Sequence, residues 1–337
     1  MSNQVAIIFI HGTKDNLTAI NYQSILDHSE GCDVYTSSQH DYLNYYYDFL
    51  GRKHISEWSG KEMWWCCDNL FLYWYLSNPK KRYKQYIIIE HDTYANMNIL
   101  DFLNVDTTTI NDHNGVMSAQ TLTYDQRKDY HWFQQFSTNP IVKNIYGIHE
   151  LTSCSPICCM MLSDEAVIEI IDNIKKYPQI NNVFSEIKYG TILSSCKNYD
   201  LSTFNNPNLI SPINKHITYE SEYCLNTLKQ YKNSNILNQA VFHPIKKINE
   251  LYEYFNCLNI DFDANNISQA LYGISLDAKS AIEKAYQEGI TEIKIDNDLC
   301  SDPAEGIAKT LRVVYVKNNQ KYVKYYQEGE TLDIKEL

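Results

Sequence analysis

The segment Val5–Ile10 (VAIIFI) constrains the fold more than any other part of this sequence. It is a continuous apolar run, rich in β-branched residues, and His11-Gly12-Thr13 follows it directly. Such a run is typical of a strand that is buried on both faces, as in the middle of a parallel sheet. We therefore expect a parallel sheet with helices on both sides.

Helix and strand patterns alternate after this strand. The expected elements are a helix over Leu17–Leu26, a short strand at Cys32–Thr36, a largely buried helix over Glu62–Leu76 ended by Asn78-Pro79, and a buried strand at Tyr86–Ile89. This order predicts an α/β fold with a doubly wound, mostly parallel sheet of Rossmann type. Ligands of such sheets bind beyond the carboxyl ends of the strands, where His11-Gly12-Thr13 and Glu90-His91-Asp92 both fall. We expect these two sequences to border one site.

Later patterns predict the rest of the architecture. Ser163 is a typical N-cap for an apolar-periodic helix that ends before Pro178. Val183–Thr191 is interpreted as a strand and turn. Composition changes after about residue 250, where a short helical pattern at Ala278–Glu288 precedes alternating segments typical of a small antiparallel sheet. A chain of 337 residues fits two domains, which we place at 1–255 and 265–337, the second a small β-rich α+β module.

Charge and composition argue against several classes of function. The chain carries 41 Asp and Glu against 29 Lys and Arg, a formal charge of -12, so it lacks the basic surface that nucleic acid or anionic lipid requires. No apolar stretch approaches the roughly 20 residues of a membrane helix, and the N-terminal run is too short for a signal peptide. We expect a soluble, cytoplasmic protein whose 10 cysteines, without a repeated Cys-x-x-Cys unit, are reduced. An anionic substrate would need a local source of positive charge.

The sharpest chemical feature is Glu90-His91-Asp92. Two carboxylates that flank one residue at a strand end can project into one site and hold a hard divalent cation through oxygen ligands. The alternative is that Asp92 caps the helix expected through Ile99–Leu103, an ordinary role for aspartate. The spacing leaves both interpretations open.

Two residues farther along the chain can add to such a site. His243 stands just before a turn that Pro244 restricts, and its imidazole could complete a metal site with Asp92. Glu186 is an acid within an otherwise apolar segment, and partial burial would raise its pKa and suit it to general-base work or to holding an acceptor hydroxyl. The alternatives are an ordinary structural histidine and an ion pair of Glu186 with Lys188 or a neighbouring helix.

Leu151–Ser163 (LTSCSPICCMMLS) joins a loop of small residues to an apolar segment. Its Ser153, Cys154 and Ser155 could line a pocket with hydroxyl and thiol groups. A buried connection between two elements is an equally good interpretation.

Several of these sequences together carry a resemblance. In chain order they are His11-Gly12-Thr13, Trp64–Asn69 (WWCCDN), Ile89–Thr93 (IEHDT), Ser153–Ser163, Ser185–Thr191 (SEIKYGT) and His243–Lys246 (HPIK). Their order and spacing resemble the GT-A class of nucleotide-sugar glycosyltransferases over residues 4–250. The resemblance implies a hexosyltransferase-like enzyme with a UDP- or GDP-sugar as donor and a sugar or glycan as acceptor.

In that class a strand-end Asp-x-Asp motif binds Mn²⁺ or Mg²⁺, which bridges the nucleotide diphosphate. The resemblance then implies that Asp92 is the metal-binding carboxylate, that Glu90 replaces the first Asp of the motif, and that His243 is a late metal ligand. Glu186 corresponds to the acid that faces the acceptor. Contacts to the nucleotide-sugar donor are expected from His11, Gly12, Thr13, Asp33, Asp68 and Glu90.

The C-terminal sequences Leu271-Tyr272-Gly273, Asp302–Gly306 (DPAEG) and Lys309-Thr310-Leu311 are similar to a short β-rich module found appended to diverse enzymes. We interpret this module as a packing element or as a contact site for protein or glycan.

Two other functions stay open at this point. His91-Asp92 could be the dyad of a metal-dependent phosphohydrolase, although such dyads sit on helices. The chain could also be a non-catalytic protein that binds nucleotide sugars or carbohydrates. An α/β-hydrolase is disfavoured because the chain contains no G-x-S-x-G sequence. The sugar, the acceptor and the stereochemical outcome are not encoded in any pattern that we identify.

Overall fold

A computed structural model of the chain describes residues 4–12, 16–38, 67–105, 113–155, 158–204, 209–210, 241–245, 267–272, 276–296, 299, 310–317 and 320–334. Thr13, a predicted donor contact, and the predicted helical residues 62–66 lie outside this set. The chain divides into two compact units. The first contains residues 1–13, 24–210 and 238–243, and the second contains 14–23, 211–237 and 244–337. The predicted domain boundary between 255 and 265 also lies outside the described residues and stays a prediction.

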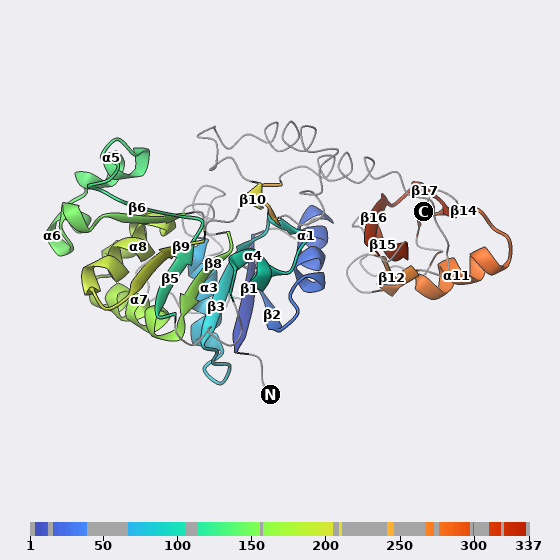
Figure 1. Cartoon of the computed structure of the whole chain (residues 1–337), viewed down its shortest axis with the longest axis horizontal. Helices are drawn as coiled ribbons and strands as arrows, with labels where there is room; N and C mark the ends of the chain where they lie inside the picture. Colours follow the sequence, from blue (N-terminus) through green and yellow to red (C-terminus); the bar gives the residue numbers. More distant parts are fainter. Residues whose placement is uncertain are drawn as a thin grey trace. The chain divides into compact units, whose positions relative to one another are not determined.

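A six-stranded sheet in the order β2-β1-β3-β8-β5-β9 forms the centre of the first unit (Figure 1). Its strands are β1 (Val5–His11), β2 (Cys32–Ser38), β3 (Gln85–Glu90), β5 (Gly115–Ser118), β8 (Met160–Ser163) and β9 (Asp200–Thr203). β8 is antiparallel to its neighbours β3 and β5, whereas the pairs β1–β2, β1–β3 and β5–β9 are parallel. The predicted mostly parallel sheet is confirmed, with one reversed strand inside it.

The first strand is buried on both faces, as its sequence predicts. Ala6, Ile8 and Ile10 face a core that they share with apolar side chains of α3, α7 and α8. Because side chains alternate between the faces of a strand, Val5, Ile7 and Phe9 lie on the opposite face, and they are equally buried. The helices of the shared core are α3 (Asp68–Ser77), α7 (Asp164–Lys176) and α8 (Ser185–Cys196).

The other predicted helices of this region are present. They are α1 (Asn16–Asp27) and α4 (Ile99–Leu103), and α3 ends at the C-cap Asn78. Ser163 caps α7 as predicted, because its Oγ accepts a hydrogen bond from the backbone N–H of Ala166 at 3.2 Å.

The prediction of a strand and turn at Val183–Thr191 is wrong, because α8 begins at Ser185. Every residue from Ser185 to Leu193 is buried, so the segment lacks the alternation of apolar and polar residues that identifies an amphipathic helix. A short segment that is buried all round cannot be assigned to helix or strand from its periodicity.

Smaller elements complete the first unit. A three-stranded sheet joins β10 (Leu209–Ile210), β11 (Val241–Phe242) and β4 (Tyr94–Ala95), and β6 (Gln120–Thr123) pairs with β7 (Thr152–Ser155). The chain between β6 and β7 forms α5 (His131–Ser137), α6 (Pro140–Ile145) and the 3-10 helix η4 (Ile148–Glu150), and η5 (Pro178–Asn182) precedes α8.

The second unit contains the predicted C-terminal elements. Its four-stranded sheet has the order β13-β12-β15-β16, with strands Leu276–Asp277, Ile267–Tyr272, Thr310–Lys317 and Gln320–Gln327. Ile282 of α11 (Lys279–Gln287) and the N-cap residue Ala278 belong to a core with β15. β14 (Glu292–Lys294) pairs with β17 (Thr331–Asp333). The role of these elements as an accessory module stays a prediction.

Two further findings concern the whole described part of the chain. No disulfide forms among its cysteines, which are Cys32, Cys67, Cys154, Cys158, Cys159 and Cys196. Within the same residues, no helix combines the length and the apolar character needed to cross a membrane.

Candidate metal centre

The candidate site lies at a topological switch point of the sheet, where the strands that follow β1 in the chain lie on its two opposite sides. β1 has β2 on one side and β3 on the other, and all three strands are parallel. Ile10 pairs with Glu90 across β1 and β3, so His11, which ends β1, and the next residue, Gly12, lie at the end of the sheet where Glu90 ends β3. Adjacent carboxyl ends at such a switch point are the usual ligand position in open α/β sheets. His11 and Gly12 thus lie at the same end of the sheet as Glu90. That the two sequences border one site stays a prediction.

A tight turn after β3 positions the two predicted carboxylates. The backbone N–H of Thr93 donates to the carbonyl of Glu90 at 3.1 Å, which closes the turn over His91 and Asp92. His91 is exposed, whereas Glu90 and Asp92 are both partly buried. Asp92 does not cap α4, because Asn98 is the N-cap and accepts from the backbone N–H groups of Leu100 and Asp101. The capping alternative for Asp92 is therefore wrong.

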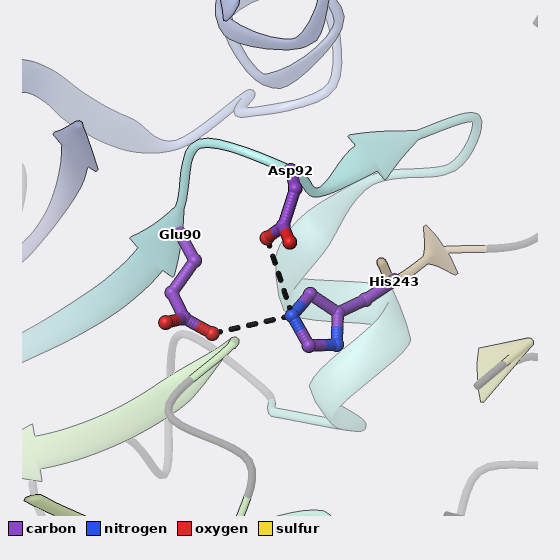
Figure 2. A group of neighbouring side chains, drawn as sticks. All are labelled: Glu90, Asp92 and His243. Atoms are coloured by element: carbon purple, nitrogen blue, oxygen red, sulfur yellow. Dashed lines mark ion pairs between the residues drawn. The ribbon is translucent and has the colours of Figure 1, made fainter. Parts of the chain in front are cut away.

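His243 reaches these carboxylates through a short antiparallel ladder. Phe242 of β11 pairs with Tyr94 of β4, so the next residue, His243, lies beside the turn that precedes β4. Figure 2 shows Glu90 and Asp92 pointing from either side toward the same nitrogen of the ring. Nε2 of His243 lies 3.2 Å from Oε2 of Glu90 and 3.3 Å from Oδ1 of Asp92. The structure thus brings together the three predicted metal ligands.

The environment of His243 favours a positive charge on its ring. Burial disfavours the imidazolium, but Cys158 and the carboxylates of Asp92 and Glu90 outweigh it and raise the pKa of His243 well above its ordinary value. Nδ1 is buried and has no hydrogen-bond partner among the residues that the structure describes. The ring is therefore oriented by its Nε2 contacts, and a metal ion bound by Nε2 would have to displace the proton on that nitrogen.

The residues present fit a divalent metal ion. One atom from each of Glu90, Asp92 and His243 can serve as a ligand, and these atoms all lie within 4.8 Å of one another. Two carboxylates and one imidazole suit Mn²⁺, while the carboxylates alone suit Mg²⁺. The side chains of Glu90 and Asp92 are 19% and 14% exposed, so the centre borders solvent on the carboxylate side.

Two thiols adjoin the centre, and no sequence pattern that we used pointed to either of them individually. Sγ of Cys67 donates to Oε1 of Glu90 at 3.4 Å, on the carboxylate oxygen that does not contact His243. Cys158 acts on His243 electrostatically and accepts a hydrogen bond from Oγ1 of Thr93 at 3.3 Å. Contacts of this kind fix the orientation of metal ligands.

Glu186 belongs to the same electrostatic environment. It lies in the first turn of α8 and is 7% exposed. Burial, and then the charge of Glu90, raise the pKa of Glu186 to about 8, while His243 acts in the opposite direction. A carboxyl group with a pKa near neutrality can exchange a proton with a bound substrate. The predicted acceptor-side acid therefore lies within electrostatic reach of the metal ligands.

The alternative partner of Glu186, Lys188, is engaged elsewhere. Nζ of Lys188 lies 2.6 Å from Oδ2 of Asp68, with both side chains 0% exposed, and donates to Oδ1 of Asn181 at 2.7 Å. Residues two apart on a helix point in different directions, so Lys188 faces α3 rather than the centre. Asp68, a predicted donor contact, is thereby enclosed in the core.

Asp33, another predicted donor contact, lies at the amino ends of the parallel strands, whereas Glu90 and Asp92 lie at their carboxyl ends. It pairs with Ala6 near the amino end of β2, whereas His11 pairs with Ser38 at the carboxyl end. Its Oδ2 accepts a hydrogen bond from the hydroxyl of Tyr83 at 2.6 Å. The structure does not bring Asp33 together with Glu90 and Asp92.

The predicted pocket residues Ser153, Cys154 and Ser155 form the buried strand β7. Their neighbour is Tyr130, which precedes α5 and which no sequence pattern singled out among 28 tyrosines. Ser153, Ser155 and Glu186 all act on the hydroxyl of Tyr130. Sequence reasoning therefore found the serines but missed the tyrosine.

No protein-family model matches the chain, and none of the curated proteins does. Among solved structures, the chain is similar to mouse xyloside xylosyltransferase 1 in its apo form. The two are 8% identical, the match covers 73% of this chain and 98% of that chain, and the TM-score is 0.34. A likeness this distant does not bear on the function of the chain.

Proposed function

We propose that the chain is a metal-dependent glycosyltransferase of GT-A type, which moves a sugar from a nucleotide-diphosphate donor to a hydroxyl acceptor. The observation that carries the proposal is the convergence of Glu90, Asp92 and His243 at the carboxyl edge of β3, beside the end of β1. In an acidic protein of charge -12, a divalent cation held at this centre would supply the local positive charge that an anionic donor needs.

The residues have distinct tasks in this reaction. Asp92, His243 and Glu90 would hold Mn²⁺ or Mg²⁺, and the ion would supply charge stabilisation for a departing nucleoside diphosphate. His11 and Gly12, at the adjoining strand end, border the nucleotide of a UDP- or GDP-sugar. Asp33 and Asp68 are not assigned to the donor, because one lies at the other edge of the sheet and the other is fully enclosed.

Glu186 faces the acceptor hydroxyl. The acceptor oxygen forms a bond to the anomeric carbon, and the bond from that carbon to the diphosphate oxygen breaks. Its electron pair leaves with the diphosphate, and the proton of the acceptor hydroxyl passes to the carboxylate of Glu186. A pKa of about 8 suits this group to proton exchange near neutral pH.

The phosphohydrolase alternative receives less support. Its dyad would need His91 beside Asp92, but His91 is exposed and the histidine that contacts Asp92 is His243. The dyad would also sit on a helix, whereas Glu90–Thr93 is a turn at a strand end.

The test is a panel of UDP- and GDP-sugars, assayed with Mn²⁺ for nucleoside diphosphate release and for a rise in melting temperature. We expect one donor to be turned over, and we expect Asp92→Asn to lower that rate at least about 100-fold. The matched control is Asp101→Asn, an exposed aspartate of α4 outside the centre, which should keep the wild-type rate.

Three outcomes would contradict the proposal in different ways. If no nucleoside diphosphate stabilises the chain in the presence of Mn²⁺, the donor assignment is wrong. Binding without turnover would favour a non-catalytic protein that binds nucleotide sugars. Phosphate release from simple phosphate esters would favour the phosphohydrolase.

A further inference from the structure

A loop at the amino ends of the strands carries the densest run of positive charge in this acidic chain. Four of the five residues 80–84 are basic, and all four basic residues are exposed. The loop joins α3 to β3 and extends from the lower edge of the first unit in Figure 1. We refer to Lys80, Lys81, Arg82 and Lys84 as the basic loop.

The charges of the basic loop are not matched by acids. No carboxylate among the residues that the structure describes lies within ion-pair distance of its four cations. Elsewhere in the described ranges, the basic side chains that pair with an acid include Arg127, Lys175, Lys188, Lys279, Lys284 and Lys294. In a chain of charge -12, the loop is therefore an exception, and the rest of the chain is more acidic than this total indicates.

Arg82 is held in one orientation by the end of α3. Its Nη1 donates to the backbone oxygen of Tyr75 at 3.0 Å and to that of Asn78 at 3.4 Å. Its guanidinium carbon also lies 3.9 Å from the centroid of the Tyr75 ring. Both hydrogen bonds use Nη1, and Nε and Nη2 donate to no group among the described residues. These two nitrogens can therefore bind a carboxylate through parallel hydrogen bonds.

Other contacts fix the rest of the loop. Nζ of Lys81 lies 4.2 Å from the ring centroid of Tyr35, at cation–π distance. The backbone N–H of Lys81 donates to the carbonyl of Asn78 at 2.9 Å, which closes a turn. The backbone N–H of Lys84 donates to the carbonyl of Gln4 at 2.9 Å, next to the first strand. Because the loop is ordered in advance, a partner loses little free energy in arranging its charges.

Two acids beside the loop are held by tyrosine hydroxyls. Oδ2 of Asp33 accepts a hydrogen bond from Tyr83 at 2.6 Å. Oδ1 of Asp164 accepts from Tyr75 at 2.8 Å and from Tyr86 at 3.1 Å. Since neither carboxylate forms an ion pair with the basic loop, the positive charges stay available to a partner.

The charge of the whole chain limits the size of that partner. Five residues span at most about 17 Å, and exposed charges more than about 8–10 Å away are largely screened at physiological ionic strength. A membrane surface or a nucleic acid would extend past the basic loop and meet the acidic remainder of the surface. A short segment with several Asp or Glu residues would meet the loop alone. The observations therefore favour a short acidic segment.

The basic loop and the metal centre lie at opposite ends of β3. Gln85 begins this strand and Glu90 ends it, and six residues of a strand span roughly 17–20 Å. A partner at the loop would therefore leave the centre uncovered.

We propose that the basic loop is a docking surface for an acidic segment of a partner protein. One carboxylate of the segment binds Nε and Nη2 of Arg82, and further carboxylates pair with Lys80, Lys81 and Lys84. The inference does not depend on the proposed function, because it uses no residue of the metal centre.

The test measures the Kd of a fluorescein-labelled peptide of alternating Gly and Glu, about eight residues long, by fluorescence polarisation with the full chain. The buffer contains EDTA and about 50 mM NaCl, so that the metal centre does not take up the peptide and screening is weak. The lysine variant combines Lys80→Gln, Lys81→Gln and Lys84→Gln. We expect it to raise the Kd about 10-fold, because three exposed ion pairs are lost.

The matched control combines Lys143→Gln, Lys175→Gln and Lys176→Gln. These lysines are also exposed, but they lie outside the basic loop, and their loss changes the net charge by the same amount. The control variant should keep the Kd within about twofold of wild type.

Arg82→Lys separates the shape of the guanidinium from its charge. This variant keeps the charge but loses the two parallel donors, and we expect it to raise the Kd about 3- to 5-fold. Its melting temperature is measured as well, because Arg82 also contacts the end of α3. The lysine variant should melt like the wild type, since it changes only exposed side chains, and it tests the proposal even if Arg82→Lys does not fold.

Cross-linking locates the bound peptide. A carbodiimide joins a carboxylate to an adjacent amine, and we expect the peptide to be joined to Lys80, Lys81 or Lys84, as identified by mass spectrometry. Equal cross-linking to Lys175 and Lys176 would show that the basic loop is not preferred.

Other outcomes would also overturn the proposal. The docking surface is wrong if the lysine variant and the control variant bind the peptide alike, or if a peptide with Gln in place of Glu binds as tightly. Vesicles of phosphatidylcholine and phosphatidylserine serve as a competing probe. If they bind the wild type more tightly than the peptide does, and the lysine variant loses them, the loop is a site for an anionic membrane instead.

Discussion

Replacing Lys188 by methionine is expected to destabilise the first unit by about 4 kcal/mol at pH 7 and by much less at pH 5. Lys188 and Asp68 form a fully enclosed ion pair, with Nζ 2.6 Å from Oδ2. At an effective dielectric constant of about 20, two unit charges at this separation attract by about 6 kcal/mol. Methionine fills similar volume, so the main loss is that of the counter-charge.

In Lys188→Met, protonation of Asp68 costs less free energy than keeping its carboxylate buried without a counter-charge. The carboxyl group can take up a proton, which costs about 4 kcal/mol at pH 7 and about 1.5 kcal/mol at pH 5, counted from an ordinary aspartate pKa of about 3.9. Protonation therefore limits the loss at both pH values. The defect of Lys188→Met should shrink by about 1.4 kcal/mol for each pH unit below 7.

Deuterium exchange of the α8 amides, measured at increasing urea concentration, reports the free energy of opening of this unit. Asp68→Asn combined with Lys188→Met should recover at least half of the loss at pH 7, because no charge is then buried alone. Lys175→Met, which removes a half-exposed lysine 3.7 Å from Asp172, serves as control and should cost less than about 0.5 kcal/mol. A defect that is equal at pH 5 and pH 7, or that persists in the double variant, would refute the reasoning.

Gly190→Ala should lower the free energy of unfolding by about 1–3 kcal/mol, since its Cβ would meet the backbone oxygen of Thr152 at 2.5 Å; an unchanged melting temperature would contradict this packing. Glu186 has a raised pKa of about 8, so its contribution to stability is complete below the ordinary pKa of 4.5 and is lost as the pH rises through 8. In metal-free protein, Glu186→Gln should therefore remove a pH-dependent loss of about 4 kcal/mol between pH 5 and pH 9, measured by urea unfolding. An equal dependence of stability on pH in both proteins would exclude a raised pKa of Glu186. Cys67→Ala should weaken Mn²⁺ binding about tenfold in calorimetry, because the thiol orients Glu90, and Cys67→Ser should restore part of the affinity.

Elements with a strong local signal were predictable from the sequence. The apolar runs of β1 and β3 and the capped, amphipathic α7 needed only their own residues. α8 was mistaken for a strand because its first nine residues are all buried, and burial by distant elements leaves no mark on local periodicity. The reversal of β8 was likewise not predicted, since strand direction depends on the path of the whole chain.

The residues of the candidate site also differ in whether a local sequence pattern identifies them. Glu90 and Asp92 were found because carboxylates at a strand end have a recognisable spacing. Cys67 and Tyr130 belong to no such pattern, because their roles depend on contacts with residues far away in the sequence. Asp68 was expected at the donor from the family resemblance, and its buried ion pair with Lys188 could not be inferred from spacing. Asp33 could have been excluded, since it begins rather than ends its strand.

His243 is placed at the centre by a ladder of two residue pairs, so its position there depends on the pairing of β11 with β4. The apparent dissociation constant of a cation equals the intrinsic constant divided by the fraction of molecules in which β11 is paired with β4. A change in β11 that never touches the cation would then alter its affinity, and a bound cation would in return keep β11 paired. Cation binding and the pairing of β11 with β4 would then be linked equilibria, each of which favours the other.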